Sequence, residues 1–133
     1  MESGRDRGEK ERIRVEDPLT ECIICCVVAV HRTLGPGFLE SVYRKALLIE
    51  LRNSSLRADT EREFPVFYAG QEVGRHRLDL LVEDQVILEL KTVEALNPSH
   101  YAQVRFYLKA TGLRKALLIN FSKERSDFRR IER

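Results

Sequence analysis

The sequence has no long hydrophobic run, only three cysteines and almost no net charge. Its longest apolar stretch is CIICCVVAV at residues 22–30, whereas a helix that crosses a bilayer needs about 20 apolar residues. The stretch follows a polar, charged start that does not fit a signal peptide. Three cysteines cannot all pair with one another, which favours reduced thiols and a cytoplasmic location. The net charge of +2 does not by itself indicate binding to nucleic acid.

The composition is that of a globular protein. Hydrophobic residues make up 43% and charged residues 33% of the 133 positions, and this length suffices for a buried core. Residues 1–17 are nearly all charged or small, with five basic and six acidic side chains, and we expect a flexible arm there. Residues 18–133 then predict a single domain.

Three segments predict helices. The first follows Asp17 or Thr20, either of which can cap it, and it ends near Thr33 before the breaker LGPG. This helix carries apolar residues on nearly all of its faces, so we expect it to be well buried. The second helix covers about residues 38–52, and the third covers about residues 99–111 with the following glycine as its stop.

Four segments predict strands. They are rich in branched and aromatic apolar residues and lie at residues 61–69, 73–82, 85–92 and 115–121. The last twelve residues, SKERSDFRRIER, predict a basic tail in which Phe128 and Ile131 act as anchors. The expected order is therefore helix, helix, three strands, helix, strand.

The cysteines lie close together in the first helix, where Cys22 and Cys25 form a C-x-x-C pair and His31 follows. A zinc site would need more ligands at suitable spacing, and the neighbouring residues are apolar. We therefore expect thiols of the core, and a thiol or zinc protein is the weakest of the functional hypotheses.

A charged pair interrupts the apolar strand VILELKTV at residues 86–93. Because side chains alternate along a strand, Glu89 and Lys91 share a face with Ile87, whereas Leu88 and Leu90 point to the other face. Such a pair in a core strand needs an explanation, because burying an ion without a partner costs several kcal/mol.

Pairing of this strand with the preceding one offers that explanation. A hairpin that pairs Val82 with Val86 places Asp79 opposite Glu89. Two opposed carboxylates repel each other, and a divalent cation removes the repulsion. Magnesium prefers hard oxygen ligands and usually needs one or two carboxylates. The sequence therefore predicts a metal site on this face of the sheet.

Two cations accompany the carboxylates. Lys91 lies one pleat beyond Glu89, within reach of a water molecule or a developing negative charge. The same register places Arg77 opposite Lys91, which makes Arg77 a candidate contact to a substrate phosphate. The alternative for Arg77 is a salt bridge to Asp79 or Glu89, and the whole set could be a structural ion-pair network.

These residues resemble the core of a known nuclease superfamily. Asp79 followed by ELK at residues 89–91 is similar to the D…(D/E)-x-K pattern of the PD-(D/E)XK nucleases. GFLESVY at residues 37–43 matches the G-x-x-E-x-x-Y pattern of the GxxExxY protein family in that superfamily. QVRFYL at residues 103–108 is similar to a helix of RecB-type nucleases. The resemblance covers about residues 20–131, although leucine replaces the proline of the superfamily pattern.

The resemblance implies an α/β fold with a mixed central sheet of about four strands flanked by helices. It also implies Mg²⁺ or Mn²⁺ bound by Asp79, Glu89 and the backbone carbonyl of Leu90, with Glu40 as an outer or additional ligand. The expected reaction is hydrolysis of a phosphodiester bond, with DNA favoured over RNA as the substrate.

The remaining roles follow from the same resemblance. Lys91 would help to activate the attacking water, and Gln103 would orient water or phosphate. Tyr43 and Tyr107 would line the site and bind substrate. The alternative is a catalytically silent domain of the same fold that binds nucleic acid or a protein partner. The small size leaves little room for a separate domain that would set specificity, so a homodimer or a protein partner is expected to direct the activity.

Overall fold

The computed structural model describes residues 17–133, so the expected arm at residues 1–17 lies outside the described residues except for Asp17. The described part contains three helices, which are α2 (Pro18–Leu34), α3 (Glu40–Asn53) and α4 (Pro98–Thr111). Their ends follow the predicted signals. The Asp17 carboxylate caps α2 by accepting a hydrogen bond from the Thr20 N–H, and Gly112 ends α4 in the left-handed conformation.

A five-stranded mixed sheet forms the centre of the molecule. In spatial order its strands are β1 (Ala58–Thr60), β4 (Leu80–Val82), β5 (Val86–Lys91), β6 (Lys115–Asn120) and β7 (Asp127–Glu132). Strands β5 and β6 run parallel, and the other neighbours run antiparallel. Helix α4 makes the crossover between the parallel pair, because parallel strands cannot be joined by a tight turn.

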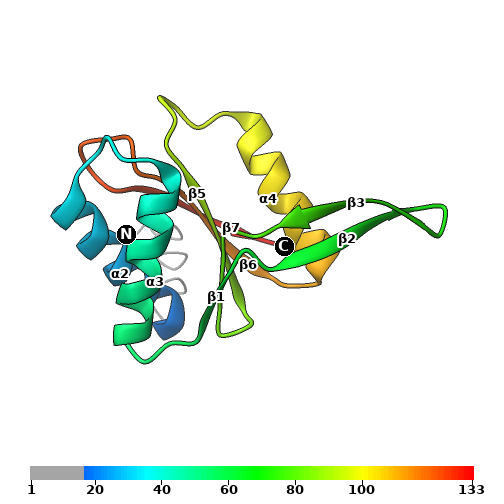
Figure 1. The fold of residues 1–133 in the computed structure, drawn as a ribbon, viewed down its shortest axis with the longest axis horizontal. Coiled ribbons are helices and arrows are strands. Elements are labelled where there is room, and N and C mark those ends of the chain that lie inside the picture. The colour runs from blue at the N-terminus through cyan, green and yellow to red at the C-terminus, as the bar shows by residue number, and fades with distance from the viewer. Residues whose placement is uncertain (1–16) are drawn as a thin grey trace, which may run out of the picture.

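Two further strands lie outside this sheet. Strands β2 (Glu63–Tyr68) and β3 (Gln71–Arg77) pair only with each other in the described structure, as an antiparallel ribbon. The ribbon extends away from the rest of the fold (Figure 1). Its base leads directly into the sheet, because Leu78 and Asp79 connect β3 to β4.

Helices cover both faces of the sheet (Figure 1). Helices α2 and α3 bury one face, where Leu88 and Leu90 of β5 join the larger apolar core. Helix α4 buries the other face, where Ile87 packs in a second core with Val104 and Leu108. Strand β5 is therefore buried on both sides, and the Glu89 side chain lies on the face that α4 covers.

The α/β class and the helix-flanked mixed sheet are confirmed, but the sheet has five strands where about four were expected. The run at 73–82 divides into two strands because the chain bends at Leu78 and Asp79. The prediction of a basic tail was wrong for residues 127–132, because they form β7. Ile131 is buried there in the second core, and Phe128 packs against the first.

Two predictions about the helices were also wrong. Helix α3 begins at Glu40 and not near residue 38, so Leu39 precedes the helix and is 75% exposed. In α2, Cys26 is buried with its thiol 3.4 Å from the Ser54 hydroxyl, but Cys25 is exposed and does not belong to the core. None of the helices in the described part of the chain is long and apolar enough to cross a membrane.

Candidate active site

The predicted carboxylates meet where β5 ends and β4 begins. The register of the two strands is as predicted, with Val82 paired to Val86. Asp79 itself lies in the bend before β4, so it does not form a ladder pair with Glu89. Its carboxylate reaches β5 directly and accepts a hydrogen bond of 2.8 Å from the Leu90 N–H.

This hydrogen bond also orients the backbone at the site. The N–H and C=O of one strand residue point to the same edge of the strand, and successive residues alternate. The Lys91 carbonyl accepts a hydrogen bond of 2.9 Å from the Phe121 N–H, on the β6 side. The Leu90 carbonyl therefore points to the opposite edge, where Asp79 lies.

Burial of Glu89 dominates the electrostatics. The residue is only 6% exposed, and Oε1 is buried without a hydrogen-bond partner among the described residues. Burial, followed by the nearby negative charge of Asp79, raises the pKa of Glu89 to about 8, although Lys91 opposes this shift. Burial likewise raises the pKa of Asp79, despite the hydrogen bond from Leu90.

A third carboxylate lies beside this pair. Glu40 begins α3, and its pKa is raised first by burial and then by the charge of Asp79, whereas Lys91 and Arg44 lower it. Within residues 17–133, no three His, Cys, Asp or Glu side chains converge closely enough to hold an ion together. Glu40 lies close enough to Asp79, Lys91 and Arg44 for their charges to shift its pKa.

The donor set fits a hard divalent cation. Asp79 and Glu89 supply carboxylate oxygens, one of them buried and unpaired, and the Leu90 carbonyl faces the same edge. Magnesium usually binds one or two carboxylates and keeps several waters, so a third carboxylate is not required. The raised pKa values of Asp79 and Glu89 mean that the protein alone neutralises this carboxylate pair poorly.

Lys91 connects the sheet to α4. Its Nζ donates a hydrogen bond of 3.1 Å to Gln103 Oε1 and lies 3.8 Å from Glu89 Oε2. Tyr107, one turn after Gln103, is buried in the same region. Burial and then the charges of Glu89 and Asp79 raise the pKa of Tyr107 to about 12, so its phenol stays protonated beside the carboxylates.

Arg77 is not opposite Lys91, so that expectation was wrong. The bend after β3 places Arg77 in the ribbon, where it pairs with Glu63 across the strands. Its guanidinium is exposed, lies 3.1 Å from the Glu63 carboxylate and 3.6 Å from that of Glu61, and makes neither of the salt bridges considered as alternatives.

Arg44 is the cation that sequence reasoning missed. It lowers the pKa of both Glu40 and Asp79, and it lies 3.7 Å from Glu61. The signal was present in the sequence, because Glu40 and Arg44 are four residues apart on one helix and such residues are neighbours on its surface.

Tyr43 has a structural position. Its side chain is 0% exposed, and its hydroxyl donates to the Gly35 carbonyl at 2.5 Å and accepts from the Phe38 N–H at 3.2 Å. Its ring stacks on Phe121 with the ring centres 4.3 Å apart. The expected contact with substrate is at odds with this burial. Tyr43 instead fixes the loop that leads into Glu40.

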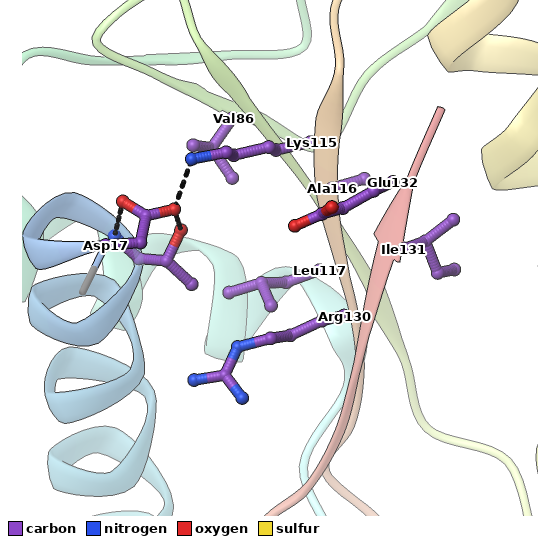
Figure 2. Close-up of a pocket in the computed structure, with 9 residues that line it drawn as sticks. Asp17, Val86, Lys115, Ala116, Leu117, Arg130, Ile131 and Glu132 are labelled. Atoms are coloured by element: carbon purple, nitrogen blue, oxygen red, sulfur yellow. Dashed lines mark hydrogen bonds and ion pairs between the residues drawn. The ribbon is translucent and has the colours of Figure 1, made fainter. Parts of the chain in front are cut away.

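A separate hollow lies at the other end of β5 and β6. Figure 2 shows this pocket of about 200 Å³, which lies beside the start of α2 and contains an ion pair between Asp17 and Lys115. Val86 and Lys115, which line it, begin their strands, whereas Glu89 and Lys91 lie at the end of β5. The carboxylate site is therefore distinct from this hollow.

Comparisons with known proteins support the superfamily and the fold. Residues 17–131 match a family model described as the PD-(D/E)XK nuclease superfamily. A solved structure titled "Crystal structure of SSO0001" is similar, with a TM-score of 0.56 and 22% sequence identity. The likeness covers 92% of this chain and 61% of that one, and it shows the fold alone. A search of curated proteins found no match.

Proposed function

The chain belongs to the PD-(D/E)XK nuclease superfamily, and we propose on this basis that it is a metal-dependent nuclease that hydrolyses phosphodiester bonds. One observation supports the proposal above the others. Glu89 holds a buried, unpaired carboxylate oxygen near Asp79 and beside Lys91. Buried carboxylates with perturbed pKa values of this kind cluster at functional sites.

In this proposal Asp79, Glu89 and the Leu90 carbonyl hold Mg²⁺ or Mn²⁺. The bound ion supplies Lewis-acid chemistry and lowers the pKa of a bound water. Glu40 is close enough to Asp79 and Lys91 to influence the same site through its charge. Burial of the carboxylates removes competing solvent and strengthens the electrostatic interactions with the substrate.

Lys91 and Gln103 act on the substrate. The Lys91 ammonium has three N–H donors, and Gln103 accepts only one of them. A further N–H can donate to a phosphate oxygen and stabilise the charge that develops during hydrolysis. Gln103 also orients water or phosphate with its own amide group.

DNA is the proposed substrate class, and RNA is the alternative. Tyr107 is placed by α4 near Glu89 and Asp79. It is only 3% exposed, so its contact with the substrate requires the site to open. The exposed Arg77 at the base of the ribbon, two residues before Asp79, remains a candidate for phosphate contact, although its ion pairs to Glu61 and Glu63 must then yield. A homodimer or a protein partner that directs the activity stays a prediction, as do the cytoplasmic location and the closer resemblance to the GxxExxY family.

The test is cleavage of supercoiled plasmid, single-stranded DNA and RNA by the wild type with Mn²⁺, Mg²⁺ or EDTA. We expect cleavage with metal only, and its loss in Glu89→Ala. Glu124→Ala, which changes an exposed carboxylate in a loop, serves as the matched control and should retain the activity. Metal-independent cleavage, or equal activity of Glu89→Ala, would contradict the proposal.

The second candidate is a silent domain that binds nucleic acid or a protein. One observation favours it, because Lys91 already contacts both Glu89 and Gln103 and could neutralise the site as a structural network. Binding of a labelled oligonucleotide without cleavage, under every metal condition, would favour this alternative.

A further inference from the structure

Asn120 is a buried polar residue next to the site. It ends β6 and is 0% exposed, and in the parallel register it lies opposite Lys91, the last residue of β5. A fully buried amide side chain is costly unless its polar atoms are hydrogen-bonded. The partners of Asn120 therefore indicate what the residue contributes.

Those partners lie just beyond the end of β5. The Val93 N–H donates to Asn120 Oδ1 at 3.1 Å, and Asn120 Nδ2 donates to the Val93 carbonyl at 2.8 Å. The Ser122 N–H also donates to Oδ1, at 3.2 Å. The amide thus copies a peptide group, with one donor and one acceptor facing the same residue. It continues the pairing between β5 and β6 after the regular strands have ended.

This contact holds the chain at Val93, two residues after Lys91. Lys91 itself is held by the pairing of β5 with β6, and its own carbonyl accepts from the Phe121 N–H at 2.9 Å. The segment after Val93 leads to α4, which carries Gln103, the hydrogen-bond partner of Lys91 Nζ. Asn120 therefore holds the start of the connection between the two elements that position the Lys91 ammonium.

We propose that Asn120 is a positioning residue that acts through Lys91, an inference that rests on the nuclease function proposed above. The Asn120 amide fixes the exit of β5, and this keeps the flexible Lys91 side chain between Glu89 and Gln103. Aspartate in place of Asn120 would lack the donor to the Val93 carbonyl, which the Ser122 hydroxyl also reaches, and alanine would leave the Val93 N–H unpaired.

The experiment compares Asn120→Ala with the milder Asn120→Ser, which keeps a small polar group. Val86→Ala is the matched control, because Val86 is also buried, at 1% exposed, but begins β5, at the end of the strand remote from the site. Cleavage is measured at saturating Mn²⁺ in the wild-type and Lys91→Ala backgrounds. The mobility of the Lys91 Cε group is measured in parallel by NMR of ¹³C-lysine protein, without substrate. Its signal is identified by its absence in Lys91→Ala.

We expect Asn120→Ala to lower cleavage about 10- to 100-fold, as is typical when a supporting residue is removed. Asn120→Ser should lower it less, and Val86→Ala should change it less than about 3-fold at a temperature where each variant is folded. In the Lys91→Ala background, Asn120→Ala should change the rate less than about 2-fold, because the two residues act as one unit. Lys91 Cε should become more mobile in the Asn120 variants and not in Val86→Ala.

Three results would overturn the proposal. They are an unchanged Lys91 mobility in both Asn120 variants, an equal loss of cleavage in Val86→Ala, and a full 10- to 100-fold loss again in the Lys91→Ala background. If the wild type cleaves no substrate, the nuclease function fails on its own. The mobility of Lys91 then decides the inference separately, since an increase in Asn120→Ser supports the contact and no increase refutes it.

Discussion

Replacement of Glu89 by glutamine should stabilise the metal-free protein at high pH. Burial and the charge of Asp79 raise the pKa of Glu89 from 4.5 to about 8, so the ionised side chain destabilises the folded state. For an isolated group this shift corresponds to about 5 kcal/mol above pH 8. Because the proton is shared with Asp79 and the site can relax, we expect Glu89→Gln to gain about 2–3 kcal/mol at pH 9.

The direction of this pH dependence of stability follows from proton binding. Between pH 4.5 and about 8 the folded protein retains a proton on Glu89 that the unfolded chain has released. The stabilisation of the wild type by this proton is complete below pH 4.5 and is lost as the pH rises toward 8. Glu89→Gln lacks this dependence, so the two proteins should be similarly stable at pH 5 and should diverge toward pH 9.

Urea denaturation in EDTA, from pH 5 to pH 9, measures this difference, with Glu124→Gln as the control for an exposed carboxylate. Added Mn²⁺ should stabilise the wild type more than Glu89→Gln, because a ligand that binds the folded state raises its stability. Parallel pH profiles, or a variant that is less stable than the wild type at pH 9, would refute the reasoning. Glu89 would then be held ionised by Lys91 as a structural ion pair.

Three further predictions concern single residues. Isothermal titration with Mn²⁺ should detect a site that Asp79→Ala abolishes, and undiminished binding would exclude Asp79 as a ligand. Tyr43→Phe should lower the free energy of unfolding in urea by about 1–2 kcal/mol, because it leaves the Gly35 carbonyl and the Phe38 N–H without their partner; no loss would mean that water replaces both contacts. Arg77→Ala should change the free energy of unfolding by less than about 1 kcal/mol, since the ion pairs of Arg77 are exposed. A larger loss would mean that Arg77 stabilises the base of the ribbon through contacts other than these ion pairs.

The carboxylates of the site could be predicted because they conflict with their surroundings. Glu89 interrupts a strand whose other residues are apolar, and the alternation of side chains placed it with Lys91 on one face. The hairpin register could be derived too, since a short turn fixes Val82 opposite Val86. These inferences depend only on residues close in sequence.

The bend at Leu78 and Asp79 could not be predicted in the same way. Leu78 is an ordinary strand residue, and nothing local shows that the ribbon leaves the sheet there. The position of Arg77 was therefore wrong, whereas Asp79 still reaches β5 because its carboxylate bonds to the Leu90 N–H. This hydrogen bond from backbone to side chain replaces the expected ladder pair and has no signature in the local sequence pattern.

The tail and the buried asparagine show a second limit. Arg129 and Arg130 made residues 127–132 look like a solvated basic tail, although Ile131 and Phe128 contact opposite cores of the sheet. Asn120 follows a run of apolar residues and reads as the end of a strand. Its partner Val93 lies 27 residues away, so its contribution became visible only when β5 and β6 were paired.

The most direct test of the central claim is to measure cleavage and Mn²⁺ affinity together in Lys91→Ala. Lys91 contacts Glu89 and Gln103 but, as an ammonium, cannot ligate a cation. At saturating Mn²⁺ we expect cleavage to fall about 10²- to 10³-fold, the typical effect of removing one well-placed donor to a developing charge. The Mn²⁺ affinity should be unchanged or slightly higher. Cleavage as fast as that of the wild type would show that Lys91 is only a structural partner of the carboxylates and would contradict the proposed mechanism.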